Sequence, residues 1–190
     1  MCATRLTAVL IACYMLVAAS CMQSCAQPAR AVVAAPDTAA YFRKAKALTT
    51  EDYFLYVDLS LPSYTNRFFV LDLKNRKVLM RGLCCSGKTK NGKTLYANTP
   101  GSNCSSKGLY KIGARYFGRF GEAYKLHGLD ATNSNALKRY VVLHSHPYVP
   151  EKPCTEDIVI SEGCPTLNPN VFKKVSEIVR KEQISYLFIQ

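Results

Sequence analysis

The sequence predicts a mainly β domain with minor α content, on three features of the chain. Short runs that alternate aromatic or aliphatic residues, such as "DYFLYVDLSL" (52–61), are typical of strands. Polar and glycine-containing segments separate these runs, as turns do. One clear helical pattern lies near the C-terminus. With 190 residues, 48% of them apolar, the chain has the size of one globular domain with its own core.

The first 31 residues are predicted to be a signal peptide rather than part of this domain. Arg5 precedes the uncharged apolar run "LTAVLIACYMLVAAS" (6–20), and small residues follow it, which is the order found in secretory signals. The run is shorter than the ~20 residues that a spanning helix needs. "VAASC" (17–21) also resembles a bacterial lipobox, in which Cys21 would be lipidated and attach the protein to a membrane. We therefore expect an exported protein of the cell envelope, periplasmic or lipid-anchored.

Residues 32–50 are expected to form a linker and a short amphipathic helix, "YFRKAKAL" (41–48), ahead of a domain that spans 51–190. After the first strand, "NRFFVLDL" (66–73) and "VLMRGLCCSG" (78–87) predict two strands joined by a tight polar turn. The stretch 87–108 carries Gly, Asn, Ser and Pro, and we expect a long functional loop there.

The second half of the chain returns to strand patterns and ends with a helix and a strand. Strands are predicted at 109–117, 123–129 and 140–146, with a short turn or helix at 133–139. Asn168 followed by Pro169 is a good helix start, because Asn caps the helix and Pro suits its first position. Apolar residues continue at helical spacing, and "SYLFIQ" (185–190) closes the chain as a strand.

The chain is strongly basic, with a formal net charge of +12. Removing residues 1–31 takes away Arg5 and Arg30 and no acidic residue, which leaves +10. Such a surface attracts anions. Anionic lipid and anionic cell wall suit an exported protein, and we expect no nucleic-acid partner.

Cys164, in "SEGC" (161–164), and His144, in "LHSH" (143–146), form the candidate chemical site. A nucleophilic Cys needs a base nearby and donors for the oxyanion that forms when it attacks a carbonyl. Gly163 allows a tight turn and close approach of a substrate, and the amides of Gly163 and Cys164 could point at one oxygen. On spacing alone a structural Cys is the commoner interpretation, since free Cys is among the most buried residue types.

The motifs resemble those of the L,D-transpeptidase catalytic domain, and more narrowly the murein L,D-transpeptidase branch whose active-site box runs Ser-x-Gly-Cys-Pro. The resemblance is carried by His144-Ser145, a fifteen-residue spacer and "SEGCP" (161–165). Further matching stretches extend it over about 66–190: "FVLDLKNRKVL", "NTPGSNCSSKGLYKIG", "GEAYKLHGLD" and "NSNALKRYVVLHS". It implies a β-sandwich or barrel with a C-terminal helix packed near the active site, and neither a cofactor nor a metal.

The resemblance also implies a role for each matched residue. Cys164 would be the nucleophile and His144 the general base, with Ser145 orienting the imidazole through its backbone carbonyl. Gly163 and Cys164 would form the oxyanion hole. Glu162 departs from the family's usual box histidine; a carboxylate turned toward the thiol would oppose thiolate formation, and we expect it to point away. A Cys paired with His⁺ has a lowered pKa, so we expect acylation near neutral pH.

Other residues are candidates for binding substrate. His146 would face the same side as His144 if the strand stays extended, so it competes for the role of base. His127 and Ser161 are predicted to lie at the substrate cleft, and Lys125 or Arg139 to meet a substrate carboxylate. If Cys164 is the free thiol of the mature chain, the other four cysteines can form two disulfides; the alternative is that they are reduced. Their positions are Cys84, Cys85, Cys104 and Cys154.

We therefore predict a cysteine-dependent murein L,D-transpeptidase. A peptidoglycan stem peptide would acylate Cys164 with release of a D-amino acid, and an acceptor amine would resolve the acyl-enzyme. Carbapenem-type β-lactams are the expected inhibitors. The alternatives are an L,D-carboxypeptidase or another wall amide hydrolase at the same site, or a non-catalytic peptidoglycan-binding protein.

Overall fold

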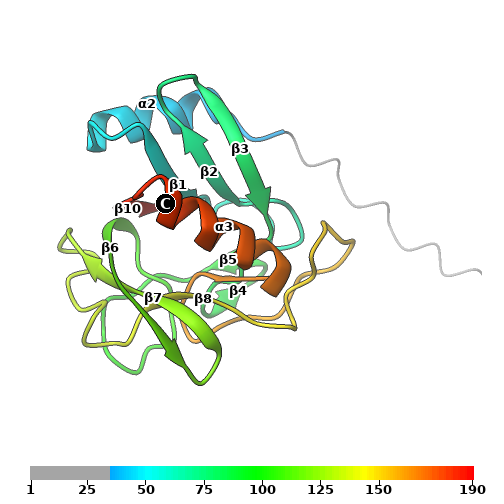
Figure 1. Ribbon diagram of the computed structural model, residues 1–190. Helices are drawn as coiled ribbons and strands as arrows, with labels where there is room; N and C mark the ends of the chain where they lie inside the picture. The colour runs from blue at the N-terminus through cyan, green and yellow to red at the C-terminus, as the bar shows by residue number, and fades with distance from the viewer. Residues whose placement is uncertain (1–34) are drawn as a thin grey trace, which may run out of the picture. The chain divides into compact units, whose positions relative to one another are not determined.

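The computed structural model describes residues 35–190, so the predicted signal peptide and Cys21 lie outside the described residues. Strands predominate, as predicted (Figure 1). The elements, in chain order, are α2 (Thr38–Leu48), β1 (Tyr53–Val57), β2 (Phe68–Asp72), β3 (Lys77–Gly82), β4 (Thr89–Lys90), β5 (Lys93–Thr94), β6 (Gly108–Gly118), β7 (Gly121–Gly128), β8 (Val142–Ser145), β9 (Thr166–Leu167), α3 (Pro169–Lys181) and β10 (Tyr186–Ile189).

One eight-stranded sheet holds all the strands except β4 and β5, in the order β3-β2-β1-β10-β6-β7-β8-β9. The β1–β10 and β8–β9 pairs are parallel, and the others are antiparallel. The last strand of the chain thus enters the middle of the sheet and joins its two halves. The strands and the C-terminal helix expected from the sequence are therefore confirmed in type and order.

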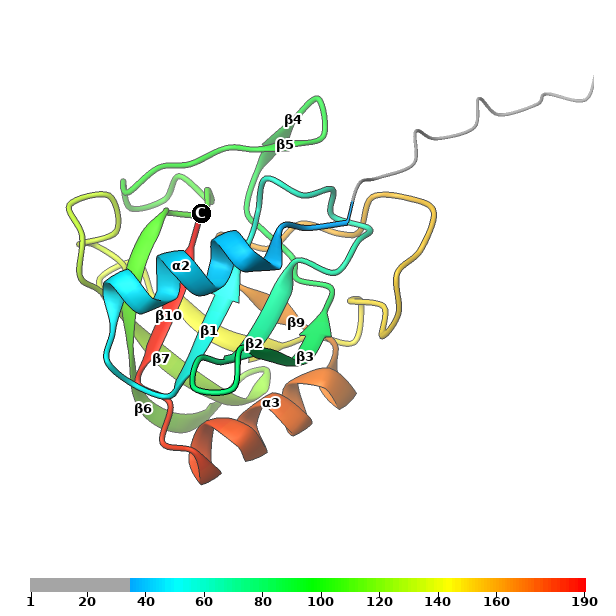
Figure 2. The ribbon, with the colours of Figure 1, turned by 90° about the horizontal axis from the view of Figure 1, so that it is seen from above.

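The alternation of side chains along β1 divides the core into two parts. Phe54 and Tyr56 pack with α2, while Leu55 and Val57 pack in the larger core that also holds the apolar face of α3. Successive residues of a strand point to opposite faces, so α2 and α3 cover opposite sides of this part of the sheet (Figure 2). Both helices contribute fully buried side chains.

The helix α2 is an integral part of the folded domain. Asp37 caps it by accepting a hydrogen bond from the Ala40 amide. The ring of Tyr41 stacks on Tyr56 at 4.4 Å, and its hydroxyl donates to the buried Asp58 at 2.6 Å. The domain as folded therefore starts before residue 51, at this helix.

Two local features were not expected from the sequence. The long loop 87–108 contains the short β4–β5 hairpin, whose turn places Asn91 and Gly92 at positive φ. The two-residue strand β9 follows directly on the cysteine box. At α3, in contrast, the Asn168 side chain caps the helix and Pro169 opens it, as predicted.

The parallel β8–β9 pair sets the geometry of the site. His144 pairs with Thr166, and Ser145 pairs with Leu167. Two residues earlier on each segment, the Val142 amide donates to the sulfur of Cys164 at 3.5 Å. The register of this pair therefore brings together the cysteine and histidine segments from distant parts of the sequence.

All five described cysteines are free thiols, so the structure has the reduced alternative and not the two disulfides. Cys84 is buried in the larger core, and Cys85 packs in a separate small apolar cluster. Adjacent residues in extended backbone point in opposite directions, which separates these two thiols, while Cys154 is exposed. Within 35–190, no helix is long and apolar enough to cross a membrane.

Candidate active site

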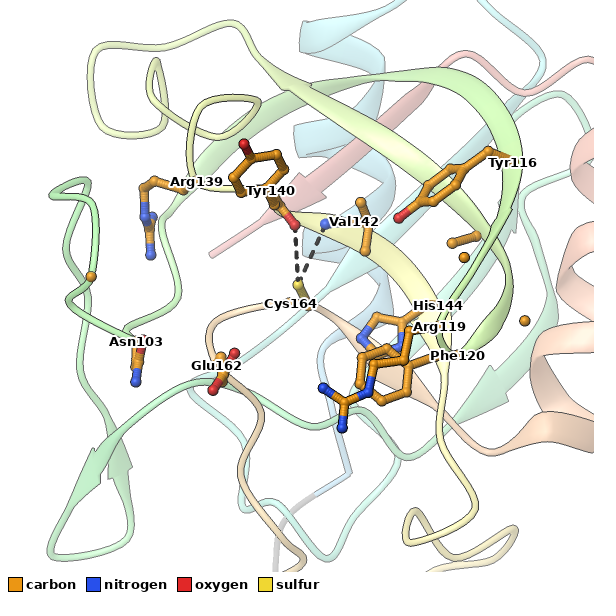
Figure 3. A pocket seen from close by; sticks show the side chains of 14 residues that line it. Asn103, Tyr116, Arg119, Phe120, Arg139, Tyr140, Val142, His144, Glu162 and Cys164 are labelled. Atoms are coloured by element: carbon orange, nitrogen blue, oxygen red, sulfur yellow. Dashed lines mark hydrogen bonds between the residues drawn. The ribbon is translucent and has the colours of Figure 1, made fainter.

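Cys164 lies at the end of the box loop, just before β9, and the residue is half-buried. The thiol is directed at the Tyr140 carbonyl, 3.7 Å away, and it accepts the Val142 amide hydrogen bond (Figure 3). Tyr140 holds this position with a positive φ of 57°. The segment that precedes β8 thus cradles the thiol from one side.

His144 is buried and held at both ring nitrogens. Nδ1 lies 3.0 Å from the Ser145 carbonyl, and Nε2 lies 3.1 Å from the Thr166 hydroxyl. The carbonyl can only accept, so Nδ1 carries the proton and Nε2 is the basic nitrogen. The Thr166 hydroxyl has one proton to share between Nε2 and the Cys164 carbonyl, which lies 3.2 Å away. The ring of Phe120 stacks on the imidazole at 5.2 Å. The orientation of the base is therefore set by β8, β9 and the β6–β7 hairpin together.

Burial favours the neutral form of both Cys164 and His144. It raises the pKa of the Cys164 thiol, against the amide of Val142 and the charge of Arg139, which act in the opposite direction. It also lowers the pKa of His144, and nearby His146 adds to that effect. Among the described residues, no hydrogen bond links the two groups. Burial therefore opposes the expected thiolate–imidazolium pair and favours a neutral thiol and a neutral imidazole.

Two cavities meet at this pair. The first, of about 350 Å³, lies between the β6–β7 hairpin and the segment 139–142. The second, of about 410 Å³, lies between the segments 146–149 and 159–162, and it is mostly apolar. Both are lined by Asn103, Phe120, His144, Glu162 and Cys164. A substrate can thus approach the thiol from two directions.

The box loop depends on Gly163 and Ser161. Gly163 has a φ of +111°, and a Cβ at this position would lie 2.5 Å from the Cys104 carbonyl oxygen. Ser161 stabilises the turn, since its hydroxyl accepts from the Gly163 amide at 3.2 Å and donates to the Cys164 carbonyl at 2.7 Å. The Gly163 amide is therefore engaged in the resting loop, and the Cys164 amide is the other candidate oxyanion donor.

The remaining predicted residues divide into those at the cavities and those away from them. His146 and Ser161 line the second cavity, and Arg139 lines the first. Arg139 donates to the Ala97 and Cys104 carbonyls, at 2.9 and 2.5 Å, so it holds the 97–106 loop in place. Neither His127 nor Lys125 lines either cavity.

His127 and Lys125 lie farther along β7. A Cβ at Gly113 would lie 2.5 Å from Nε2 of His127, which shows that this ring covers β6. The ammonium of Lys125 lies 5.8 Å from the ring of Tyr116. The placement of His127 outside the cleft corrects the expectation that it lies at the substrate site.

Glu162 also corrects an expectation, because it does not point away from the site. Its exposed side chain lines both cavities, and its charge contributes to raising the pKa of Cys164. In the view of Figure 3 it lies below the thiol, between Asn103 and the pair formed by His144 and Phe120.

Three residues of the site were missed in the sequence. Thr166 lies two residues after the cysteine, and the only available signal was that it would share a strand face with Cys164. Phe120 lies in the turn of a hairpin that the sequence predicted as two strands without identifying its turn. Tyr140 precedes a predicted strand, and nothing local indicates its positive φ. In 35–190 no group of three or more His, Cys, Asp or Glu residues is placed to hold a metal ion.

Comparison with known families identifies this arrangement. The model of the L,D-transpeptidase catalytic domain matches residues 29–188. The chain belongs to the L,D-transpeptidase catalytic domain family. A comparison with curated proteins found no match.

Solved structures of this fold resemble the domain at low sequence identity. The helical cell shape determining protein Pgp2 from Campylobacter jejuni, as its K307A mutant, is 9% identical, with a TM-score of 0.50 over 82% of this chain and 57% of that one. An L,D-transpeptidase from Mycobacterium smegmatis is 15% identical, with a TM-score of 0.43 over 73% and 58%. LdtMt1 in complex with imipenem is 14% identical, with a TM-score of 0.43 over 74% and 59%. The chain thus spans less than two thirds of the length of each of these three chains.

Proposed function

We propose that this protein is a cysteine-dependent L,D-transpeptidase that acts on peptidoglycan stem peptides. The observation that carries the proposal is the meeting of two cavities at Cys164 and His144. A transpeptidase must present an acyl donor and then an acyl acceptor to one sulfur atom, and a site open on two sides suits that sequence of events. The basic surface suits acidic stems.

In the acylation step, the thiol must leave its contacts with Tyr140 and Val142 and turn toward the imidazole. Nε2 of His144 then takes the thiol proton as sulfur attacks the carbonyl carbon of the donor peptide. The carbonyl oxygen becomes an oxyanion, to which the Cys164 amide can donate. When the tetrahedral intermediate collapses, the C–N bond breaks and His144 returns the proton to the departing amine of the D-amino acid. The thioester remains on Cys164, and the imidazole is again neutral.

Resolution by an amine makes a cross-link, whereas resolution by water makes the same site an L,D-carboxypeptidase. Export remains part of the proposal, on the signal-like segment 1–31, with Cys21 as the site of a lipid anchor in its lipoprotein form. Peptidoglycan lies outside the cytoplasm, so the proposed substrate and the proposed location agree.

The test is intact-protein mass spectrometry after incubation with imipenem, followed by peptide mapping. We expect one adduct, on Cys164, and no adduct in Cys164→Ser or Cys164→Ala. Cys154→Ser is the matched control, because Cys154 is the exposed thiol of the described chain and should be irrelevant to acylation. An adduct mapped to any other cysteine, or a wild-type protein that is never acylated, would overturn the proposal and favour a peptidoglycan-binding role.

A further inference from the structure

Glu162 presents an unpaired carboxylate at the point where the two cavities meet. Its side chain is exposed, and it lines both of them next to Cys164. Within residues 35–190, the structure gives this carboxylate no hydrogen bond and no ion pair. An exposed carboxylate that lines both cavities and makes neither of these contacts with the rest of the described chain is available for a ligand.

Glu162 is surrounded by side chains of opposite charge. The other ionic side chains that line the cavities are basic: Arg119 and Arg139 in the first, and Lys88 in the second. Glu162 is thus the only acidic residue lining either cavity in the described part of the chain. A cationic amine would be repelled from such a site unless a negative group received it.

We propose that Glu162 binds the ammonium group of the acyl acceptor and selects a cationic primary amine over water. This inference rests on the proposed function and assigns the acceptor side of that reaction. The location of Glu162 suits this role. Because it lies beside Cys164 and lines both cavities, it can hold an acceptor in one cavity while the donor occupies the other. The carboxylate also has a cost for the first step, since it contributes to raising the pKa of the thiol.

The second step releases one proton, and Glu162 is placed to receive it. An ammonium cannot attack, so it first gives one proton to the Glu162 carboxylate, which passes it to solvent. The neutral amine then attacks the thioester carbonyl and forms the C–N bond. Its second proton moves to Nε2 of His144, the C–S bond breaks, and the departing sulfur takes that proton. The products are a new amide, the free Cys164 thiol and one proton in solution.

The experiment uses a tetrapeptide stem as donor, with its side-chain amine acetylated so that it cannot act as acceptor. Two nucleophiles compete with water: a tripeptide stem with a free side-chain ammonium, and hydroxylamine, which is uncharged at neutral pH. Mass spectrometry then quantifies the cross-link, the hydroxamate and the hydrolysed donor. The variants are Glu162→Gln, Glu162→Asp and, as matched control on the same loop, Glu156→Gln, whose exposed side chain lines neither cavity.

We expect Glu162→Gln to lower the ratio of cross-link to hydroxamate about tenfold, which corresponds to one charge-assisted hydrogen bond. Glu162→Asp should keep part of this ratio, and Glu156→Gln should equal wild type. An unchanged ratio in Glu162→Gln, or an equal loss of all three products, would overturn the assignment. A wild type that is acylated but yields only hydrolysed donor would refute the amine acceptor while leaving the cysteine mechanism standing. A wild type that is never acylated would remove both.

Discussion

Nε2 of His144 and the hydroxyl of Thr166 lie 3.1 Å apart across the β8–β9 pair. The hydroxyl therefore contacts the nitrogen that would take the thiol proton in the proposed mechanism. The same hydroxyl lies 3.2 Å from the Cys164 carbonyl, so it also contacts the box loop. In the proposed mechanism, Thr166 positions the imidazole and must release Nε2 before acylation.

Thr166→Val should raise the pKa of His144, because a donor to Nε2 stabilises the neutral imidazole and valine removes it. The low-pH limb of the acylation profile should move to higher pH, while Val keeps the volume of Thr in this buried position. The measurement is the rate of imipenem adduct formation against pH. An unshifted limb would mean that Thr166 only fills space.

His144→Ala should slow acylation of Cys164 by ~10²–10⁴-fold, the usual contribution of a general base. His146→Ala should reduce the rate of acylation far less. Its Nδ1 accepts from the Tyr148 amide at 3.2 Å, which ties it to its own loop. The rates follow from time-resolved mass spectrometry, with circular dichroism as a check on folding. A large loss in His146→Ala with a small one in His144→Ala would make His146 the base.

The pH dependence should show a neutral pair rather than a preformed ion pair. Burial lowers the pKa of His144, so the base becomes competent as pH rises through a value below its ordinary ~6.5, and acylation should plateau at neutral pH. Burial raises the pKa of Cys164, so alkylation by iodoacetamide, which requires the thiolate, should increase only above the ordinary ~8.5. Both profiles are best measured in Cys154→Ser, which lacks the exposed thiol. Rapid alkylation already at pH 7 would show that an ion pair exists.

Gly163→Ala should destabilise the protein and abolish most acylation. The alanine would combine a positive φ with a contact of 2.5 Å to a backbone oxygen, so the box loop must move. Gly92→Ala is the control, because it has a φ of +72° but meets nothing within 4 Å. Backbone strain alone should lower the free energy of unfolding of Gly92→Ala, measured in urea, by about 1–2 kcal/mol. Its acylation should equal that of wild type. Equal behaviour of the two variants would show that the close contact does not matter.

Stability should fall at alkaline pH because of the buried thiols. Burial raises the pKa of Cys84 to about 12 and of Cys85 to about 11. Above the ordinary ~8.5 the unfolded chain loses these protons while the folded chain keeps them, so the free energy of unfolding decreases as pH rises. Each thiol should cost about 1.4 kcal/mol near pH 9.5. Urea unfolding at pH 7 and 9.5 measures the loss, and Cys84→Ala should reduce it; equal stability at the two pH values would contradict the burial of both thiols.

By itself, the sequence determined the elements whose signals are local. The alternation in "DYFLYVDLSL" and the Asn168-Pro169 cap predicted β1 and the start of α3, because side-chain period and capping depend only on neighbouring residues. The motif around His144 and Cys164 indicated the family for a similar reason, because it consists of residue types at fixed spacings in the sequence.

Only the tertiary structure decided how these parts meet. The pairing of His144 with Thr166, the stacking of Phe120 on the imidazole and the inward position of Glu162 join segments that are more than fifteen residues apart. Such contacts depend on strand register and on the path of the loops, neither of which leaves a periodic signal in the chain. The same holds for the cysteines. A disulfide requires two β-carbons about 3.5–4.5 Å apart with their sulfurs directed at each other, and burial in separate clusters keeps Cys84 and Cys85 as thiols.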